Sequence, residues 1–187
     1  MSILPKDYKE PDTSNYMRLK QGENRFRVLS EAIVGMEYWK DDGENRKPVR
    51  KQSGEKIDMS DLETDPKTGE LKMPKHFWAF VVWNYQSEKV QILELTQATI
   101  RRKLIALDSN KKWGDFREYD ITITKEGEGF DTTYETMPDP KSKIDGGIVQ
   151  MAKDMHINLK ALFTGEDPFT SEVKVDVDEV AKSLGVK

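Results

Sequence analysis

Aromatic and basic side chains that could bind a nucleic acid gather in two stretches of this 187-residue sequence. Residues 76–85, His-Phe-Trp-Ala-Phe-Val-Val-Trp-Asn-Tyr, form a predicted strand with rings on both faces, although a small barrel can bury only one face of each strand. Residues 45–51, Asn-Arg-Lys-Pro-Val-Arg-Lys, are rich in cations. Because bases stack on rings while cations follow phosphates, this combination predicts a site for single-stranded nucleic acid.

The pairing of 76–85 with the next strand decides which of its rings face outward. Residues 89–95 form the second arm of a hairpin, and if Tyr85 pairs with Lys89, then Val82 opposes Ile92 and both face the interior. The outer face then carries Phe77, Trp83 and Tyr85 beside Lys75, Lys89 and Gln91. Two alternatives stay open: C-terminal helices could cover this face, and a one-residue change of register would exchange the two faces.

Basic residues supply the phosphate contacts that such a site needs. A long loop carries Arg46, Lys47, Arg50 and Lys51. These cations could release counterions from a phosphate backbone, or they could belong to a solvated loop. Arg25 and Arg27 alternate with Phe26 and Val28 along a strand, and could contact phosphates or pair with Glu23 and Glu37. Basic residues at 101–103 fit the solvated face of a helix.

Residue types that support catalysis are few and poorly spaced. The chain has no cysteine, which excludes disulfides and thiolate sites. His76 and His156 lack metal-ligand spacing, and the stretch 108–115 departs from a calcium loop because Lys112 takes a ligand position. We therefore expect no catalytic residue, no metal and no cofactor, and a protein that is not an enzyme; a hydrolase is a third, separate alternative.

Hydrophobic periodicity predicts the elements that position these side chains. The expected elements are strands over 24–39 (bent at Gly35), 76–85, 89–95, 119–124 and 132–137, a helix from an N-cap at Thr96 to about Asp108, and short helices near 157–162 and 177–184. Residues 40–74 are expected to form a long loop with a helical turn near 58–62.

This order of elements is that of an OB-fold. We therefore expect a mainly β protein, a five-stranded Greek-key barrel with a helix between strands 3 and 4 and extra C-terminal short helices. Its site would lie on strands two and three, between the long loop and the glycine turn at 126–129. The predicted domains are a flexible arm over 1–17, an OB-fold domain over 18–138 and an extension over 139–187.

Charge and hydropathy indicate the compartment and the class of partner. The formal net charge of −4 conceals basic stretches at 45–56 and 100–113. No window approaches the roughly 18 consecutive apolar residues of a membrane span, and residues 1–7 do not resemble a signal peptide. We expect a cytoplasmic protein with no membrane partner.

Several runs resemble the single-stranded-DNA-binding proteins of bacteriophage replication and recombination modules. The runs are Leu-Lys-Gln-Gly-Glu-Asn-Arg-Phe-Arg-Val-Leu at 19–29, Tyr-Trp at 38–39 with Lys-Pro-Val-Arg at 47–50, the aromatic strand at 76–84, Val-Gln-Ile-Leu-Glu-Leu-Thr-Gln at 90–97, and Tyr-Asp-Ile-Thr-Ile at 119–123. The resemblance spans about 18–138. It implies that Trp39, Lys47, Arg50, Trp78 and Trp83 lie near DNA.

The resemblance also implies a function. Such a protein coats and protects single-stranded DNA without reading its sequence, in the host cytoplasm, and passes it to replication or recombination proteins. This chain departs from the pattern at its C-terminus, where charges of both signs replace a strongly acidic tail. The alternative function is a protein-interaction or virion structural module whose aromatic face is a subunit interface. The expected partner is single-stranded DNA or RNA, because no residue pattern marks recognition of the sugar hydroxyl.

Overall fold

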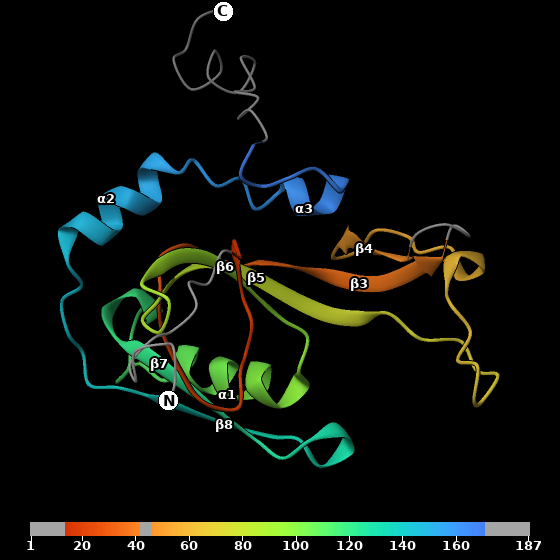
Figure 1. Ribbon diagram of the computed structural model, residues 1–187, viewed down its shortest axis with the longest axis horizontal. Coiled ribbons are helices and arrows are strands. Elements are labelled where there is room, and N and C mark those ends of the chain that lie inside the picture. The colour runs from red at the N-terminus through yellow and green to blue at the C-terminus, as the bar shows by residue number, and fades with distance from the viewer. Residues whose placement is uncertain (1–13, 42–45, 171–187) are drawn as a thin grey trace, which may run out of the picture.

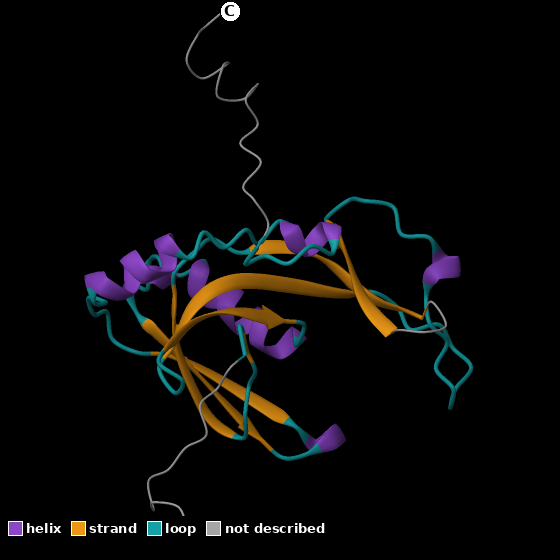
Figure 2. Ribbon diagram, turned by 45° about the horizontal axis from the view of Figure 1, so that its top comes forward, coloured by secondary structure: helices purple, strands orange, loops and turns teal. Residues whose placement is uncertain are grey.

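The computed structural model describes residues 14–41 and 46–170, and over these residues the strands join into a single mixed sheet (Figure 1, Figure 2). The strands are β1 (Tyr16–Met17), β2 (Gly22–Val28), β3 (Ile33–Asp41), β4 (Arg46–Gln52), β5 (Lys75–Asn84), β6 (Lys89–Leu95), β7 (Asp120–Glu126) and β8 (Thr133–Pro138). The helices are α1 (Ala98–Asp108), α2 (Gly146–Asp154) and α3 (Ala161–Thr164), with single 3-10 turns η1 (Met59–Asp61), η2 (Phe116–Glu118) and η3 (Gly129–Asp131).

The sheet is open, so the predicted five-stranded barrel is wrong. Its main path runs β1-β6-β5-β2-β7-β8, and β3 pairs with β5 and β4. The fold is a mixed α/β structure with an eight-stranded sheet among the described residues. The expected helix does lie between the strands at 89–95 and 120–126, as α1. The order of these elements along the chain therefore does not determine whether the sheet closes.

The N-terminal residues give a physical reason for the open sheet. Strand β1 pairs in parallel with β6, and the amide of Ile92 donates to the carbonyl of Asn15 at 3.0 Å. This pairing occupies the edge of β6 that a closing strand would need. Strand β8 pairs with β7 along its whole length and, within the described chain, with no other strand. Residues 14–17, predicted to belong to a flexible arm, thus form an ordered edge of the sheet, and residues 1–13 lie outside the described part.

Apolar clusters cover both faces of the central strands. Helix α1 packs on one face, where Ile100 and Leu104 join Phe26, Val82 and Ile121. Helices α2 and α3 and the residues around them cover the opposite face of β5 and β6, as Figure 1 shows. Strand β5 is apolar on both faces because both faces are buried.

The observed hairpin register differs by one residue from the predicted one. Val82 pairs with Gln91, and Ile92 pairs with Val81. Val82 does face α1, but Ile92 lies on the opposite face beneath α2 and α3. The prediction that Val82 and Ile92 share an interior face is therefore wrong.

Strand β4 lies within the segment that was predicted to be a loop. Its sequence Arg-Lys-Pro-Val-Arg-Lys-Gln lacks the alternation of a half-buried strand, but an edge strand tolerates both charge and proline. The helical turn expected near 58–62 is present as η1. The long strand predicted over 24–39 is divided into β2 and β3, so the break lies at residues 29–32 and not at Gly35.

The C-terminal helices match the predictions in part. Helix α3 overlaps the one expected near 157–162, whereas α2 was not predicted. The helix expected at 177–184 lies outside the described residues. Among the helices that the structure describes, none is long and apolar enough to cross a membrane.

Tyr119 places a hydroxyl in the core beside α1. Its side chain is fully buried, and its hydroxyl oxygen has no hydrogen-bond partner within the described structure. Burial, with smaller contributions from nearby carboxylates such as Asp108, raises its pKa from an ordinary value near 10 to about 12. The folded state therefore disfavours the phenolate.

Tyr119→Phe is expected to flatten the loss of stability at alkaline pH. Between about pH 10 and 12 the unfolded chain gives up this proton first, so the free energy of unfolding falls as the pH rises through that window. At neutral pH the variant should be as stable as the wild type, or more stable by up to ~1 kcal/mol, because an unpaired hydroxyl is removed. Urea unfolding followed by circular dichroism at pH 7 and at about pH 11, half-way between the pKa values of the unfolded and folded chain, measures both effects. Equal pH dependence in both proteins would contradict this assignment.

Candidate nucleic-acid interface

The predicted aromatic platform is covered by the chain's own C-terminal part. Phe77 is fully buried and Trp83 is 9% exposed. Both pack in the cluster that contains Leu159 and Leu162, and the ring of Phe77 meets that of Phe163 edge-on at 5.8 Å. The expectation that Phe77 and Trp83 offer rings to a base on a free surface is therefore corrected.

The remaining predicted residues of this hairpin do not make a common surface either. Gln91 is fully buried, where it accepts a hydrogen bond from Asn84 and donates one to the carbonyl of Ser14. Trp78 is half-buried and lines a separate cavity of about 630 Å³ beside α1. Lys75 is exposed at the start of β5, and Lys89 is half-buried at the start of β6.

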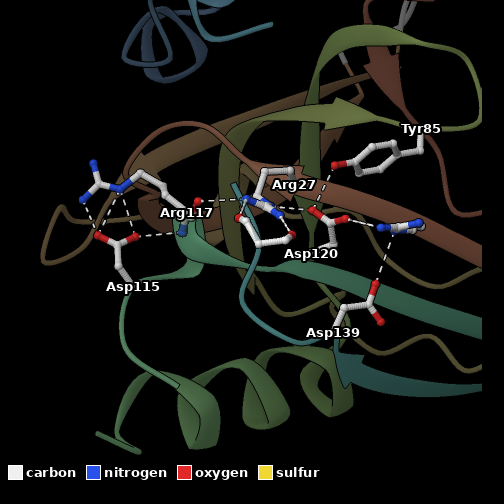
Figure 3. A network of polar contacts seen from close by, with 8 residues as sticks. Arg27, Tyr85, Asp115, Arg117, Asp120 and Asp139 are labelled. Atoms are coloured by element: carbon white, nitrogen blue, oxygen red, sulfur yellow. Dashed lines mark hydrogen bonds and ion pairs between the residues drawn. The ribbon is translucent and has the colours of Figure 1, made fainter. Parts of the chain in front are cut away.

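Arg25 and Arg27 belong to an ion-pair network centred on Asp120 (Figure 3). The side chains of Arg27 and Asp120 are each 1% exposed, and their Nε and Oδ1 atoms lie 2.5 Å apart. Arg27 also donates to the carbonyls of Arg117 and Ser142. Of the two interpretations proposed from the sequence, pairing with an acid is the one that applies to Arg27. Its partner is Asp120, however, and not Glu23 or Glu37.

The exposed arginine of the pair is also engaged. Arg25 contacts Asp120 at 2.5 Å and Asp139 at 3.3 Å, and its guanidinium lies 4.6 Å from the centre of the Tyr85 ring. The Tyr85 hydroxyl donates to Asp120 at 3.0 Å, and burial raises its pKa. Arg25 and Tyr85 are therefore held together on the surface by the same carboxylate.

Trp39 is the predicted aromatic residue that remains exposed. Strands β3 and β4 form a ribbon that extends away from the body of the sheet (Figure 1). Trp39 lies on this ribbon, paired with Pro48 and 38% exposed. The guanidinium of Arg46 lies 4.4 Å from the centre of its ring, and Arg46 also binds Glu63. The cation–π contact holds the ring in place at the surface.

A cavity of about 580 Å³ opens beside this ribbon, and we call it the ribbon groove. It lies where the sheet fails to close, between the β1–β6 edge and the β7–β8 hairpin. Its lining residues are Tyr16, Met17, Arg18, Leu19, Glu37, Trp39, Pro48, Arg50, Leu93, Glu94, Gln97, Lys125 and Tyr134. Three rings and three cations thus surround one concave site.

A second cavity of about 460 Å³ continues the ribbon groove. The two cavities share Tyr16, Pro48 and Arg50. The second one reaches Lys47 on β4 and the residues that follow α3, including Phe169. Together they make an extended concave path along β4. Lys51 is half-buried at the far end of β4 and lines neither cavity.

Arg50 lies between two carboxylates in the ribbon groove. Its Nη2 atom is 3.0 Å from Glu37 and 2.7 Å from Glu94, and its side chain is 13% exposed. Burial raises the pKa of Glu94, and Arg50 opposes that rise. Arg50 was predicted to contact phosphate, but in the structure it forms ion pairs with these two acids.

The groove residues that sequence reasoning missed come from segments that looked unremarkable. Tyr16 lies within the N-terminal stretch that was predicted to be a flexible arm, and Arg18 directly follows it. Lys125 and Tyr134 flank the β7–β8 turn, which the OB-fold argument had placed beside the site without naming these residues. That turn position was the signal that could have identified them.

Neither a metal site nor a known relative adds to this description. Within residues 14–41 and 46–170, no group of three or more His, Asp or Glu side chains is placed to hold a metal ion. Comparison with protein-family models, curated proteins and solved structures finds no match for this chain. Function must therefore be argued from the groove itself.

Proposed function

We propose that this chain binds single-stranded DNA in the ribbon groove without reading a defined sequence. The observation that carries the proposal is the exposed ring of Trp39 at the wall of a concave path that also contains Tyr16 and Tyr134. Rings that line such a path can stack on bases of any type, each worth about 1–3 kcal/mol. Coating and protecting single strands during replication or recombination would follow from this binding.

The cations of the groove support the same proposal. Arg18 and Lys125 line the groove and Lys47 lines its continuation. In the described structure none of these three forms an ion pair with an acid, unlike Arg46 and Arg50. They are therefore available to neutralise phosphates, which makes affinity depend on salt.

The alternative of a subunit interface on the aromatic face receives no such support. That face of β5 and β6 is covered by residues of α2, α3 and their flanking segments. A second subunit could bind there only by displacing them. The ribbon groove, by contrast, is an open concave surface lined by the rings of Tyr16, Trp39 and Tyr134.

Trp39→Ala is expected to weaken binding to a dT oligonucleotide by about 1–3 kcal/mol and to remove most of the tryptophan fluorescence quenching. Fluorescence anisotropy of a labelled oligonucleotide and intrinsic fluorescence measure the two effects. Trp78→Phe is the matched control, because Trp78 lines the separate cavity beside α1 and its replacement should leave affinity unchanged.

Lys125→Ala and Arg18→Ala should each make the negative slope of log K against log salt less steep by ~0.7, because each removes one phosphate contact. Wild-type protein that does not bind at low salt, or a Trp39→Ala variant with full affinity, would refute the proposal.

A further inference from the structure

The ribbon groove contains more negative than positive charge around Arg50. One guanidinium nitrogen, Nη2, contacts both Glu37 and Glu94. Two carboxylates thus share one cation, which leaves one negative charge in this part of the groove. A phosphate would be repelled here, whereas a neutral base would not.

Two polar atoms in this cluster have no hydrogen-bond partner among the residues that the structure describes. They are Oε1 of Glu94 and Nε of Arg50, and both are buried. A buried polar atom without a partner is costly and uncommon, so each such atom in a native structure calls for an explanation. Glu94 nevertheless lines the groove, and its side chain is 22% exposed. Rotation of this carboxylate would present an acceptor to a molecule in the groove.

The chemistry of the bases determines which of them this acceptor suits. Cytosine, adenine and guanine carry an exocyclic amino group that donates hydrogen bonds, and acidic side chains accept from such groups. Thymine has no amino group, and the one donor on its Watson–Crick edge, N3–H, lies between the O2 and O4 acceptors. A carboxylate in the groove therefore accepts from the amino group of the first three bases, whereas the donor of thymine is flanked by two acceptors that the carboxylate repels.

We propose that the ribbon groove prefers bases with an exocyclic amino group over thymine, and that Glu94 determines this preference. The inference rests on the proposed single-stranded-DNA binding at the same site. The cations Arg18, Lys125 and Lys47 contact phosphates along the path, while one base turns inward toward Glu94. The preference concerns the type of base and does not define a sequence motif.

The test compares dC and dT oligonucleotides of equal length in competition, with anisotropy as the readout. Wild-type protein should bind dC at least ~5-fold more tightly, which corresponds to one good base contact. Glu94→Gln should reduce the ratio to below ~2-fold and raise the affinity for dT, because an amide can donate to thymine oxygens and carries no charge. Glu31→Gln, on the separate cavity beside α1, should keep the wild-type ratio.

A modified oligonucleotide tests the same idea without any change in the protein. Replacing cytosine by N4,N4-dimethylcytosine removes both amino donors, and wild-type protein should then bind it no more tightly than dT. This arm decides the question even if Glu94→Gln does not fold. Wild-type binding of dT as tight as dC, or tight binding of the dimethylated oligonucleotide, overturns the base preference while single-strand binding stands. A preserved ratio in folded Glu94→Gln overturns the role of Glu94, and failure to bind any oligonucleotide overturns the proposed function itself.

Discussion

Arg27→Met is expected to lower the free energy of unfolding by about 3–5 kcal/mol, because it leaves a buried carboxylate without its buried cation. The Arg27 and Asp120 side chains are each 1% exposed, and Arg27 donates to Asp120, to two backbone carbonyls and to the Ser142 hydroxyl. Methionine can replace the aliphatic stem but none of these hydrogen bonds. The remaining partners of Asp120 are Arg25 and the Tyr85 hydroxyl.

Arg25→Met provides the control for this prediction. Its side chain is 52% exposed, so water can solvate Asp120 on that side and the cost should stay below about 1 kcal/mol. Urea unfolding of both variants, followed by circular dichroism, measures the difference. Equal losses of stability in the two variants would show that the buried Arg27–Asp120 pair stabilises the protein no more than the exposed Arg25–Asp120 pair.

These two arginines also show where sequence reasoning stops. Arg25 and Arg27 alternate identically with apolar neighbours, so their spacing gives no reason to treat them differently. Both pair with Asp120, 93 positions from Arg27 along the chain, but Arg27 is 1% exposed and also donates to Ser142, whereas Arg25 is 52% exposed. A long-range contact of this kind leaves no local pattern, and that is why one of the two predicted phosphate contacts is instead a buried structural ion pair.

The elements were largely predictable, whereas their assembly was not. Periodicity identified β5, β6, α1 and β7, because each of them buries apolar residues at regular spacing, and the glycine turn at 126–129 located β8. Strand β4 has no such face, and β1 is only two residues long. Yet these two unpredicted strands define the shape of the sheet, because β1 occupies the edge of β6 and β4 completes the ribbon.

The same limit applies to the candidate site. Trp39, Lys47 and Arg50 were proposed to lie near DNA, and the structure places all three on one path, although it pairs Arg50 with acids. Phe77 and Trp83 were proposed from the surplus of rings on β5, but a surplus can be covered by protein as well as by a ligand. The sequence of the C-terminal part, with helix α2 unpredicted, gave too weak a signal to decide between them.

Gly35→Ala is expected to destabilise the protein by about 3 kcal/mol, the upper end of the range for overpacking. A Cβ atom at this position would overlap the backbone carbonyl of Lys51 and would lie 2.9 Å from ring atoms of both Phe77 and Phe163. The carbonyl belongs to β4 and cannot rotate away as a side chain could. The ribbon must therefore shift against α3.

The shift should also reach the ribbon groove, because Trp39 and Arg50 lie on the same two strands as Gly35 and Lys51. Weaker oligonucleotide binding should accompany the loss of stability. Gly146→Ala is the matched control: this glycine begins α2, has no atom within 4 Å of an added Cβ, and should be neutral or slightly stabilising. Urea unfolding and anisotropy of the two variants measure both effects. A Gly35→Ala protein as stable as Gly146→Ala would mean that β4 can move away from β3 at little cost, and that the ribbon is not held by this close approach.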